Sequence, residues 1–144
     1  MDDRKGNSRI SLEIILTKKQ KEILINHAEN SFPNESCALL FGNVDSKTHI
    51  VKDIFLTENI DNSPINFTVS NDELLRGYKE AEQKKMDVIG VFHSHPHSEA
   101  IPSATDRKFM EINPIVWVIF SNKYDEIKAF ILESDIVSIP INTV

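Results

Sequence analysis

Two periodicities of apolar residues run along the chain and predict an α/β protein. Short apolar runs bounded by turn-forming residues are typical of strands, and apolar residues three or four positions apart are typical of amphipathic helices. Strands are expected at residues 10–16, 37–41, 49–56, 87–92, 115–120 and 126–133, with a last one at 136–139. Helices are expected at about 17–30, 70–85 and 105–111. Strands outnumber helices, and without a repeat or linker the pattern predicts one domain.

Turn and capping signals set the ends of these elements. Thr17 and Gln20 have the spacing of a capping box that opens the first helix. Ser70 and Glu73 have the same spacing before the second helix. Gly42 is expected to end the second strand, with a polar turn following at 43–47. The expected buried stripes are Ile23, Leu24 and Ala28 on the first helix and Leu74, Tyr78 and Ala81 on the second.

Composition narrows the class of protein. The 144 residues carry a net charge of −6, with 40% hydrophobic and 26% charged residues, which is ordinary for a globular domain. Binding to a phosphate backbone needs surplus Lys and Arg, so we expect no nucleic acid partner. The single cysteine, Cys37, excludes an internal disulfide and a cysteine-based zinc site, and it indicates a reducing compartment.

The N-terminal segment and the longest apolar runs predict the location of the protein. Residues 1–8 are polar, and we expect a disordered tail there and a folded domain over residues 9–144. The tail lacks the apolar core of a signal peptide. The longest apolar runs, such as residues 114–120, are too short to span a bilayer. We therefore expect a cytoplasmic protein without a membrane partner.

His93 and His95 carry most of the chemical information in the sequence. They stand at the end of a buried strand, and because alternate residues of a strand share a face, both imidazoles can point at one atom. Asp106, in the first turn of the next helix, can supply a carboxylate. Two imidazoles and one carboxylate make a three-ligand zinc site with a fourth position open, which is typical of catalytic zinc.

Simpler interpretations of these residues stay open at this point. A pair of histidines two residues apart is common in proteins that bind no metal. Ser103 and Asp106 have capping-box spacing and would start a helix in any case, although one residue can cap and ligate through different atoms. His97 is expected at the surface, and His27 and His49 are expected to be ordinary helix and strand residues.

The segment around the two histidines resembles the JAMM motif of the MPN-plus metalloproteases. His93-x-His95 is followed at that family's spacing by Ser103 and Asp106, and the sequence VIGVFHSHP runs through the histidines. The family also has an upstream glutamate in the form E-x-C-G-x-L-x-G. The matching stretch begins at Glu35 and reads ESCALLFG, with alanine in place of the first glycine.

The resemblance implies a fold and a role for each motif residue. The fold would be a curled, mixed, mostly antiparallel sheet flanked by helices, an architecture similar to that of cytidine deaminases. His93, His95 and Asp106 would bind one zinc ion per chain. Glu35 would be the general base that later protonates the leaving amine, and Ser103 would donate a hydrogen bond to the developing oxyanion.

The resemblance also implies a class of substrate. Family members with the complete motif hydrolyse peptide or isopeptide bonds at the C-terminus of ubiquitin or ubiquitin-like proteins. With little spare sequence between its core elements, this chain resembles the compact archaeal and bacterial type, similar to desampylases and deubiquitinases. We therefore expect a ubiquitin-like protein or its conjugates as substrate, cleavage after a Gly-Gly tail, and a homodimer as a further expectation.

The same residues are compatible with other functions in part. A peptidase that trims the C-terminus of a sulfur-carrier protein fits the same residues, and so does a non-catalytic MPN scaffold subunit, although five retained motif residues argue against a scaffold. RadC-like proteins have Asn between the histidines, where this chain has Ser94. A zinc nucleobase deaminase is excluded because its H-x-E and P-C-x-x-C signature is absent.

Overall fold

The computed structural model describes residues 12–144 and contains eight strands and three helices in that range. In chain order they are β1 (Glu13–Leu16), α2 (Lys18–Ser31), β2 (Cys37–Asp45), β3 (Thr48–Thr57), α3 (Asn71–Gln83), β4 (Asp87–His95), α4 (Ala104–Ile112), β5 (Val116–Ser121), β6 (Glu126–Leu132), β7 (Ile136–Ile139) and β8 (Ile141–Thr143). The expected tail at 1–8 lies outside the described residues. None of the helices in residues 12–144 is long and apolar enough to cross a membrane.

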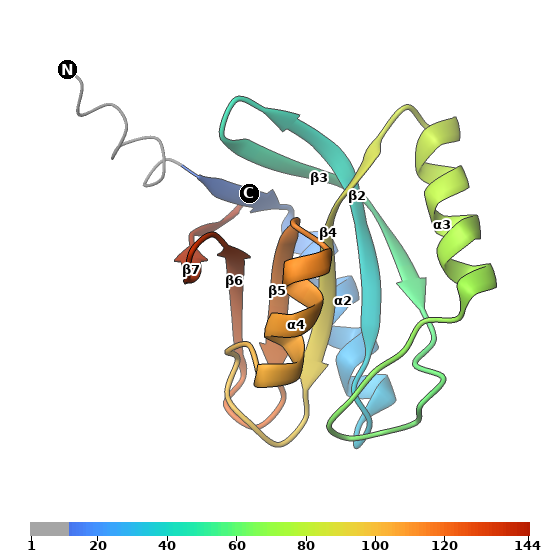
Figure 1. Cartoon of the computed structure of the whole chain (residues 1–144), viewed down its shortest axis with the longest axis vertical. Coiled ribbons are helices and arrows are strands. Elements are labelled where there is room, and N and C mark those ends of the chain that lie inside the picture. Colours follow the sequence, from blue (N-terminus) through green and yellow to red (C-terminus); the bar gives the residue numbers. More distant parts are fainter. Residues whose placement is uncertain (1–11) are drawn as a thin grey trace.

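All eight strands belong to one mixed sheet, in the order β7-β6-β5-β4-β2-β3-β1-β8. Three neighbouring pairs are parallel, namely β1 with β3, β1 with β8, and β4 with β5. The other four pairs are antiparallel. The outer strands β7 and β8 are joined through Pro140 alone, so the sheet curls until its two edges are close together (Figure 1). This confirms the expected α/β fold with a curled, mostly antiparallel sheet.

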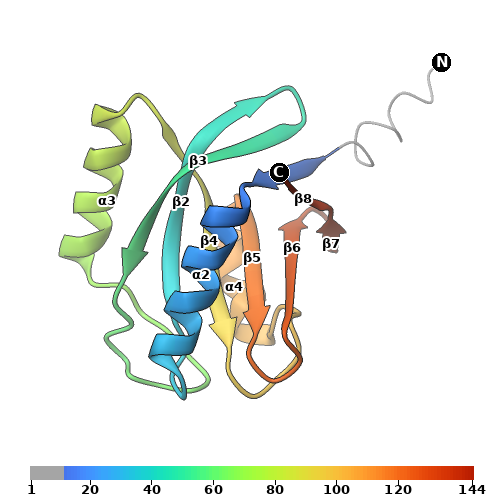
Figure 2. The same cartoon turned by 180° about the vertical axis from the view of Figure 1, so that it is seen from behind.

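Helices cover both faces of the sheet. Helix α2 lies on one face (Figure 2), and α3 and α4 lie on the other (Figure 1). Because side chains alternate along a strand, Leu40 packs in the core beneath α2, whereas Leu39 packs with Ala81 of α3. The same alternation turns Phe92 of β4 toward α2. It leaves His93 on the face that carries α3 and α4, against the ring of Trp117.

Gly42 does not end the second strand, and the expected turn at 43–47 is wrong in its extent. β2 continues to Asp45, and the hairpin turn is confined to Ser46 and Lys47. A Cβ atom on residue 42 would lie 1.9 Å from the carbonyl oxygen of Ile50, at the point where the β2–β3 register shifts. Glycine is therefore required by the close approach of β3, and the strand passes through it.

Two smaller expectations, the burial of Tyr78 and the capping box of α3, also need correction. Tyr78 is 51% exposed, because α3 approaches the sheet through its small residues Gly77 and Ala81. Ser70 caps α3 by accepting a hydrogen bond from the Glu73 N–H, but the Glu73 carboxylate accepts from the Glu58 N–H and leaves the capping box incomplete.

Strand β8 was not predicted, since three residues are too few for a periodic pattern. The capping box of α2 and the burial of Leu24 and Ala28 are confirmed, whereas Ile23 is only half-buried.

Candidate active site

Three ligand-type atoms meet at the end of β4. The Nε2 atoms of His93 and His95 lie 3.1 Å apart, and each lies 3.1 Å from the Oδ2 atom of Asp106. Tetrahedral zinc with bonds of about 2.0–2.1 Å holds its ligand atoms about 3.3 Å apart, so this triangle has the dimensions of three corners of a zinc tetrahedron. The three side chains are buried. The donor set and its spacing therefore fit zinc.

The tautomer of His95 also supports a cation at the centre of the triad. Its Nδ1 lies 2.8 Å from the carbonyl oxygen of Glu99, and a carbonyl can only accept, so Nδ1 carries a proton. In a neutral ring, Nε2 then carries no proton, and its lone pair faces the Asp106 carboxylate. Two lone pairs 3.1 Å apart in a buried site repel unless a cation lies between them. A metal ion or a proton must occupy that position.

Without a metal ion, the shifts in the pKa values of the triad favour one positive charge, held between His95 and Asp106. Burial lowers the pKa of His93, and the hydrogen bond to Asp106 opposes that effect only in part. Burial also acts to lower the pKa of His95, but hydrogen bonds to Asp106 and the Glu99 carbonyl outweigh it and raise the pKa. Burial acts to raise the pKa of Asp106, yet hydrogen bonds from both histidines hold it far below its ordinary value. A proton between His95 and Asp106 thus stands where a metal would bind.

Asp106 combines two roles through one atom. Ser103 is the N-cap of α4, its hydroxyl accepts a hydrogen bond from the Asp106 N–H, and the Asp106 Oδ2 accepts from the Ser103 N–H, which confirms the capping box. The same Oδ2 atom that accepts the Ser103 N–H also faces both histidines. The helix cap therefore fixes the carboxylate toward the triad. The Ser103 hydroxyl still has its proton to donate.

Glu35 lies beside the triad, two residues before the first residue of the neighbouring strand β2. Cys37 pairs with His93 in the β2–β4 register, and the Ser94 N–H donates to the Ser36 carbonyl one step further along, so Glu35 follows opposite His95. The Glu35 side chain is 5% exposed. Burial raises the pKa of Glu35 from 4.5 to about 8, with His95 lowering it and Asp106 raising it further. Glu35 is thus able to hold or release a proton near neutral pH.

The remaining expected residues lie where the sequence predicted. His97 is exposed and its ring touches that of Phe32 edge-on, at 5.4 Å between centroids. His27 Nε2 lies 3.0 Å from the Cys37 carbonyl and 3.1 Å from the Thr57 carbonyl, so it donates to both and ties α2 to the sheet. Cys37 is a buried residue of β2, and burial raises the pKa of its thiol to about 11.

The aromatic surroundings of His93 were not among the expected features of the site. The ring of Phe67 stacks on His93 at a centroid distance of 5.0 Å, and Trp117 contacts it edge-on at 5.6 Å. The Nδ1 atom of His93 is buried and has no hydrogen-bond partner among the described residues. A lone aromatic residue in the polar segment before α3 was the one signal that could have indicated Phe67.

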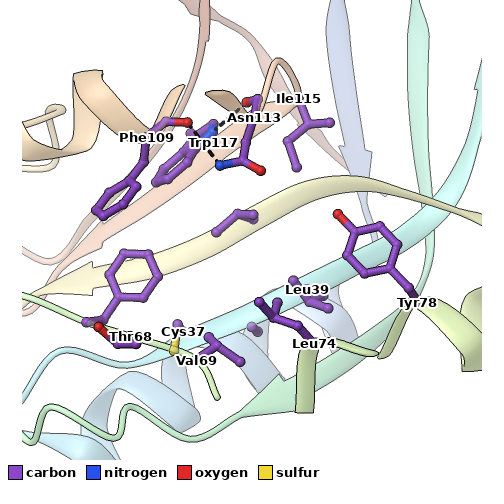
Figure 3. A pocket seen from close by; sticks show the side chains of 13 residues that line it. Cys37, Leu39, Thr68, Val69, Leu74, Tyr78, Phe109, Asn113, Ile115 and Trp117 are labelled. Carbon is purple, nitrogen blue, oxygen red and sulfur yellow. Dashed lines mark hydrogen bonds between the residues drawn. The ribbon is translucent and has the colours of Figure 1, made fainter. Parts of the chain in front are cut away.

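An apolar groove begins at these aromatic residues and runs between α3 and α4. Its volume is about 260 Å³. Phe109 and Trp117 lie on one side of the groove and Leu74 on the other, with Tyr78 at its far end (Figure 3). Phe67 and Trp117 line the groove and also contact His93, so these two rings connect the groove to the triad.

The curled sheet with its helices, together with the two-histidine, one-aspartate site, defines a JAB-type domain. The sequence profile described as prokaryotic homologs of the JAB domain matches residues 17–132. The chain belongs to this family, and the resemblance to the compact prokaryotic JAMM proteins is confirmed.

Individual relatives agree with this membership. The chain is 38% identical over 98 residues to a desampylase of Pyrococcus furiosus, covering 68% of this chain and just under two thirds (66%) of that protein. It is 26% identical over 125 residues to a CysO-cysteine peptidase of Mycobacterium tuberculosis, covering 84% of each. The solution structure of a protein from Desulfitobacterium hafniense superposes with a TM-score of 0.82 at 32% identity, over 91% of this chain and 92% of that one.

Proposed function

We propose that this protein is a zinc-dependent peptidase or isopeptidase that cleaves after the C-terminal Gly-Gly of a ubiquitin-like modifier. The observation that carries the proposal is the triangle of His93, His95 and Asp106 with Glu35 beside it. The three ligand atoms lie 3.1 Å apart, and the fourth corner of the tetrahedron is left for the reaction. A structural zinc site would be closed by a fourth protein ligand.

His93, His95 and Asp106 would hold one zinc ion per chain. When bound, zinc supplies a Lewis acid that acidifies a water molecule and polarises a carbonyl group. The Glu99 carbonyl fixes His95 in the tautomer that presents Nε2 to the metal, and the Ser103 N–H fixes the Asp106 carboxylate. These hydrogen bonds preorganise the site before any metal arrives.

Glu35 and Ser103 would perform the proton transfer and the oxyanion contact. Hydrolysis of an amide needs a base to take a proton from the attacking water and an acid to protonate the leaving amine. Burial raises the pKa of Glu35 to about 8 in the metal-free site, and the positive charge of a bound zinc ion would lower it again, so Glu35 would take the proton as a carboxylate and return it to the leaving amine. The Ser103 hydroxyl has a free proton for the developing oxyanion, a contact worth about 3 kcal/mol in comparable sites.

The apolar groove between α3 and α4 supports a substrate with an extended apolar tail. An extended chain advances about 3.3 Å per residue, so a tail whose last bond reaches the triad would place the residues preceding it among Phe67, Leu74 and Phe109. A terminal Gly-Gly would pass the aromatic rings around His93 without side chains of its own. The names of the relatives, a desampylase and a CysO-cysteine peptidase, support a small modifier protein as the substrate.

A second candidate function is removal of a C-terminal amino acid from a sulfur-carrier protein. The similarity to a CysO-cysteine peptidase over 84% of the chain favours it. The same residues would act in the same way, and only the leaving amine would differ, being a free amino acid in place of a lysine side chain. Cleavage assays with both kinds of substrate distinguish the two functions.

The test combines zinc analysis with cleavage of a ubiquitin-like fusion protein. We expect wild type to contain one zinc ion per chain and to cleave after Gly-Gly. Glu35→Gln should keep zinc and lose cleavage, whereas His95→Ala should lose both. Glu29→Gln and His97→Ala are matched controls at exposed positions and should behave as wild type.

Either of two results would contradict the mechanism. Wild type that binds no zinc under saturating conditions would remove the metal from the site and favour a non-catalytic scaffold. Full activity in Glu35→Gln would show that proton transfer does not depend on this carboxylate.

A further inference from the structure

Asn59 is the most completely hydrogen-bonded side chain near the site. It lies in the segment between β3 and α3 and is 8% exposed. Its Nδ2 donates to the carbonyl oxygens of Glu35 and Asn66, both at 3.0 Å. Its Oδ1 accepts from the N–H groups of Asp61 and Thr68, also at 3.0 Å. A primary amide has two donors and two acceptor sites, so Asn59 is fully used.

One of these hydrogen bonds acts on the backbone of Glu35. Glu35 precedes the first residue of β2, so the strand ladder does not hold its peptide groups. Its N–H instead donates to the Ser63 carbonyl at 2.8 Å, and its carbonyl accepts from Asn59. The segment that Asn59 organises therefore holds Glu35 from both sides.

The opposite end of the same segment acts on a zinc ligand. Asn59 holds the Thr68 N–H, and the neighbouring residue Phe67 stacks on His93 at 5.0 Å with an angle of 29° between the rings. A metal-bound histidine usually donates its second ring nitrogen to a hydrogen-bond partner that orients it. Because the His93 Nδ1 has no such partner among the described residues, ring packing by Phe67 takes over that task.

We propose that Asn59 is a positioning residue that sets Glu35 and His93 relative to each other. It bonds four backbone groups of one segment and of the Glu35 peptide, so a shift in its amide moves the proton-transfer group and the Phe67 ring together. This inference rests on the proposed function for the identity of the reaction. The coupling itself is independent of what the substrate is.

Asn59→Asp is the sharpest variant for testing this role. A carboxylate keeps both acceptor contacts but replaces Nδ2 by an oxygen that faces two carbonyl oxygens at 3.0 Å, where it repels both. Asn62→Asp is the matched control because it places the same charge in the same segment. Asn62 is exposed, and aspartate tolerates its φ of 49°.

We expect Asn59→Asp to lower kcat by about 10- to 100-fold relative to Asn62→Asp, the range for residues that orient metal ligands, with KM unchanged. Zinc content should stay at one per chain. In the NMR spectrum the ring protons of His93 should lose the ring-current shift caused by Phe67, in the metal-free and the zinc-loaded protein alike. Wild-type kcat, or an unchanged His93 shift, would overturn the proposal. So would a loss of activity explained by loss of zinc alone.

A measurement on wild type keeps the proposal testable if Asn59→Asp does not fold. The amide protons of Glu35, Asp61 and Thr68 should exchange with solvent through one common opening, with the same free energy and the same dependence on denaturant. Independent exchange of the three would overturn the proposal. If wild type cleaves no modifier fusion, the proposed function fails, while the His93 shift and the exchange data still decide the role of Asn59.

Discussion

Ser36 and Ser94 join the ends of β2 and β4 on the sheet face opposite to His93 and His95. Their hydroxyl oxygens lie 2.9 Å apart, and the Ser94 hydroxyl also accepts the Ser36 N–H at 2.9 Å. Both residues are buried. Because they continue the pairing one residue beyond Cys37 and His93, they bring Glu35 opposite His95.

Ser94→Ala should therefore cost both stability and activity. The substitution leaves the buried Ser36 N–H without its acceptor, which costs about 1–3 kcal/mol of unfolding free energy. It also frees the strand end that carries Glu35, so kcat should fall while zinc remains bound. Denaturant unfolding and a cleavage assay measure the two effects, with Ser98→Ala at an exposed position as the control. Equal stability of the two variants would contradict the role of this pair.

Stability of the metal-free protein should depend on pH through Glu35. Its pKa in the folded protein, about 8, lies above its ordinary value of 4.5, so the stability that its bound proton confers is complete below pH 4.5 and is lost as the pH rises through 8. Glu35→Gln resembles the protonated form at every pH. The free energy of unfolding of Glu35→Gln should therefore exceed that of wild type by an amount that grows between pH 5 and 9, by up to about 4 kcal/mol.

Unfolding in the presence of a chelator at several pH values measures this difference. Glu29→Gln changes an exposed glutamate and should follow wild type across the range. A difference between Glu35→Gln and wild type that stays constant with pH would show that Glu35 ionises normally in the fold.

Asp106→Asn should separate the helix cap from the metal site. The amide oxygen of asparagine can still accept the Ser103 N–H and keep the capping box, but it brings no negative charge to the histidines. Zinc at 100 times its Kd should stabilise wild type by about 2.7 kcal/mol and should barely stabilise Asp106→Asn. Thermal unfolding with and without zinc measures this, with Asp72→Asn in the first turn of α3 as control. Equal stabilisation of both variants would exclude Asp106 as a ligand.

The sequence was sufficient to predict the parts of the site that depend on local geometry. His93 and His95 share a face because they are two residues apart on a strand, and Ser103 and Asp106 share a helix turn because of capping-box spacing. The position of Glu35 came from its resemblance to a family motif. Periodicity alone gave no reason to place it next to a residue 60 positions later.

The parts that could not be predicted depend on contacts between distant backbone groups. Asn59 stood in a polar loop, and nothing in its neighbours indicated that it would bond the Glu35 carbonyl. Glu73 had the spacing to complete a cap, yet the Glu58 N–H competes for its carboxylate. Gly42 was interpreted from local turn preference, whereas the Ile50 carbonyl on the adjacent strand decides its identity.

Phe109→Ala should weaken substrate binding with little effect on the reaction itself. Phe109 lines the groove between α3 and α4 and is 42% exposed, so truncation should cost little stability. Loss of an exposed aromatic anchor at an interface typically costs 1–2 kcal/mol of binding, which corresponds to a KM about tenfold higher for a modifier fusion. Phe32, 49% exposed and outside the groove, gives the control Phe32→Ala. A lower kcat with unchanged KM would contradict binding in the groove.

Gly42→Ala should be strongly destabilising although it adds a single methyl group in a strand. The new Cβ would lie 1.9 Å from the Ile50 carbonyl oxygen and 2.9 Å from Ile89, so the backbones of β2 and β3 must separate. Overpacking that moves backbone costs about 3 kcal/mol. Gly90→Ala is a graded control, because its Cβ would meet Leu40 and the Val116 carbonyl oxygen at 3.0 Å, a contact that small shifts relieve. Denaturant unfolding should rank wild type above Gly90→Ala and Gly90→Ala above Gly42→Ala, and the reverse order would mean that β2 does not pass this close to β3.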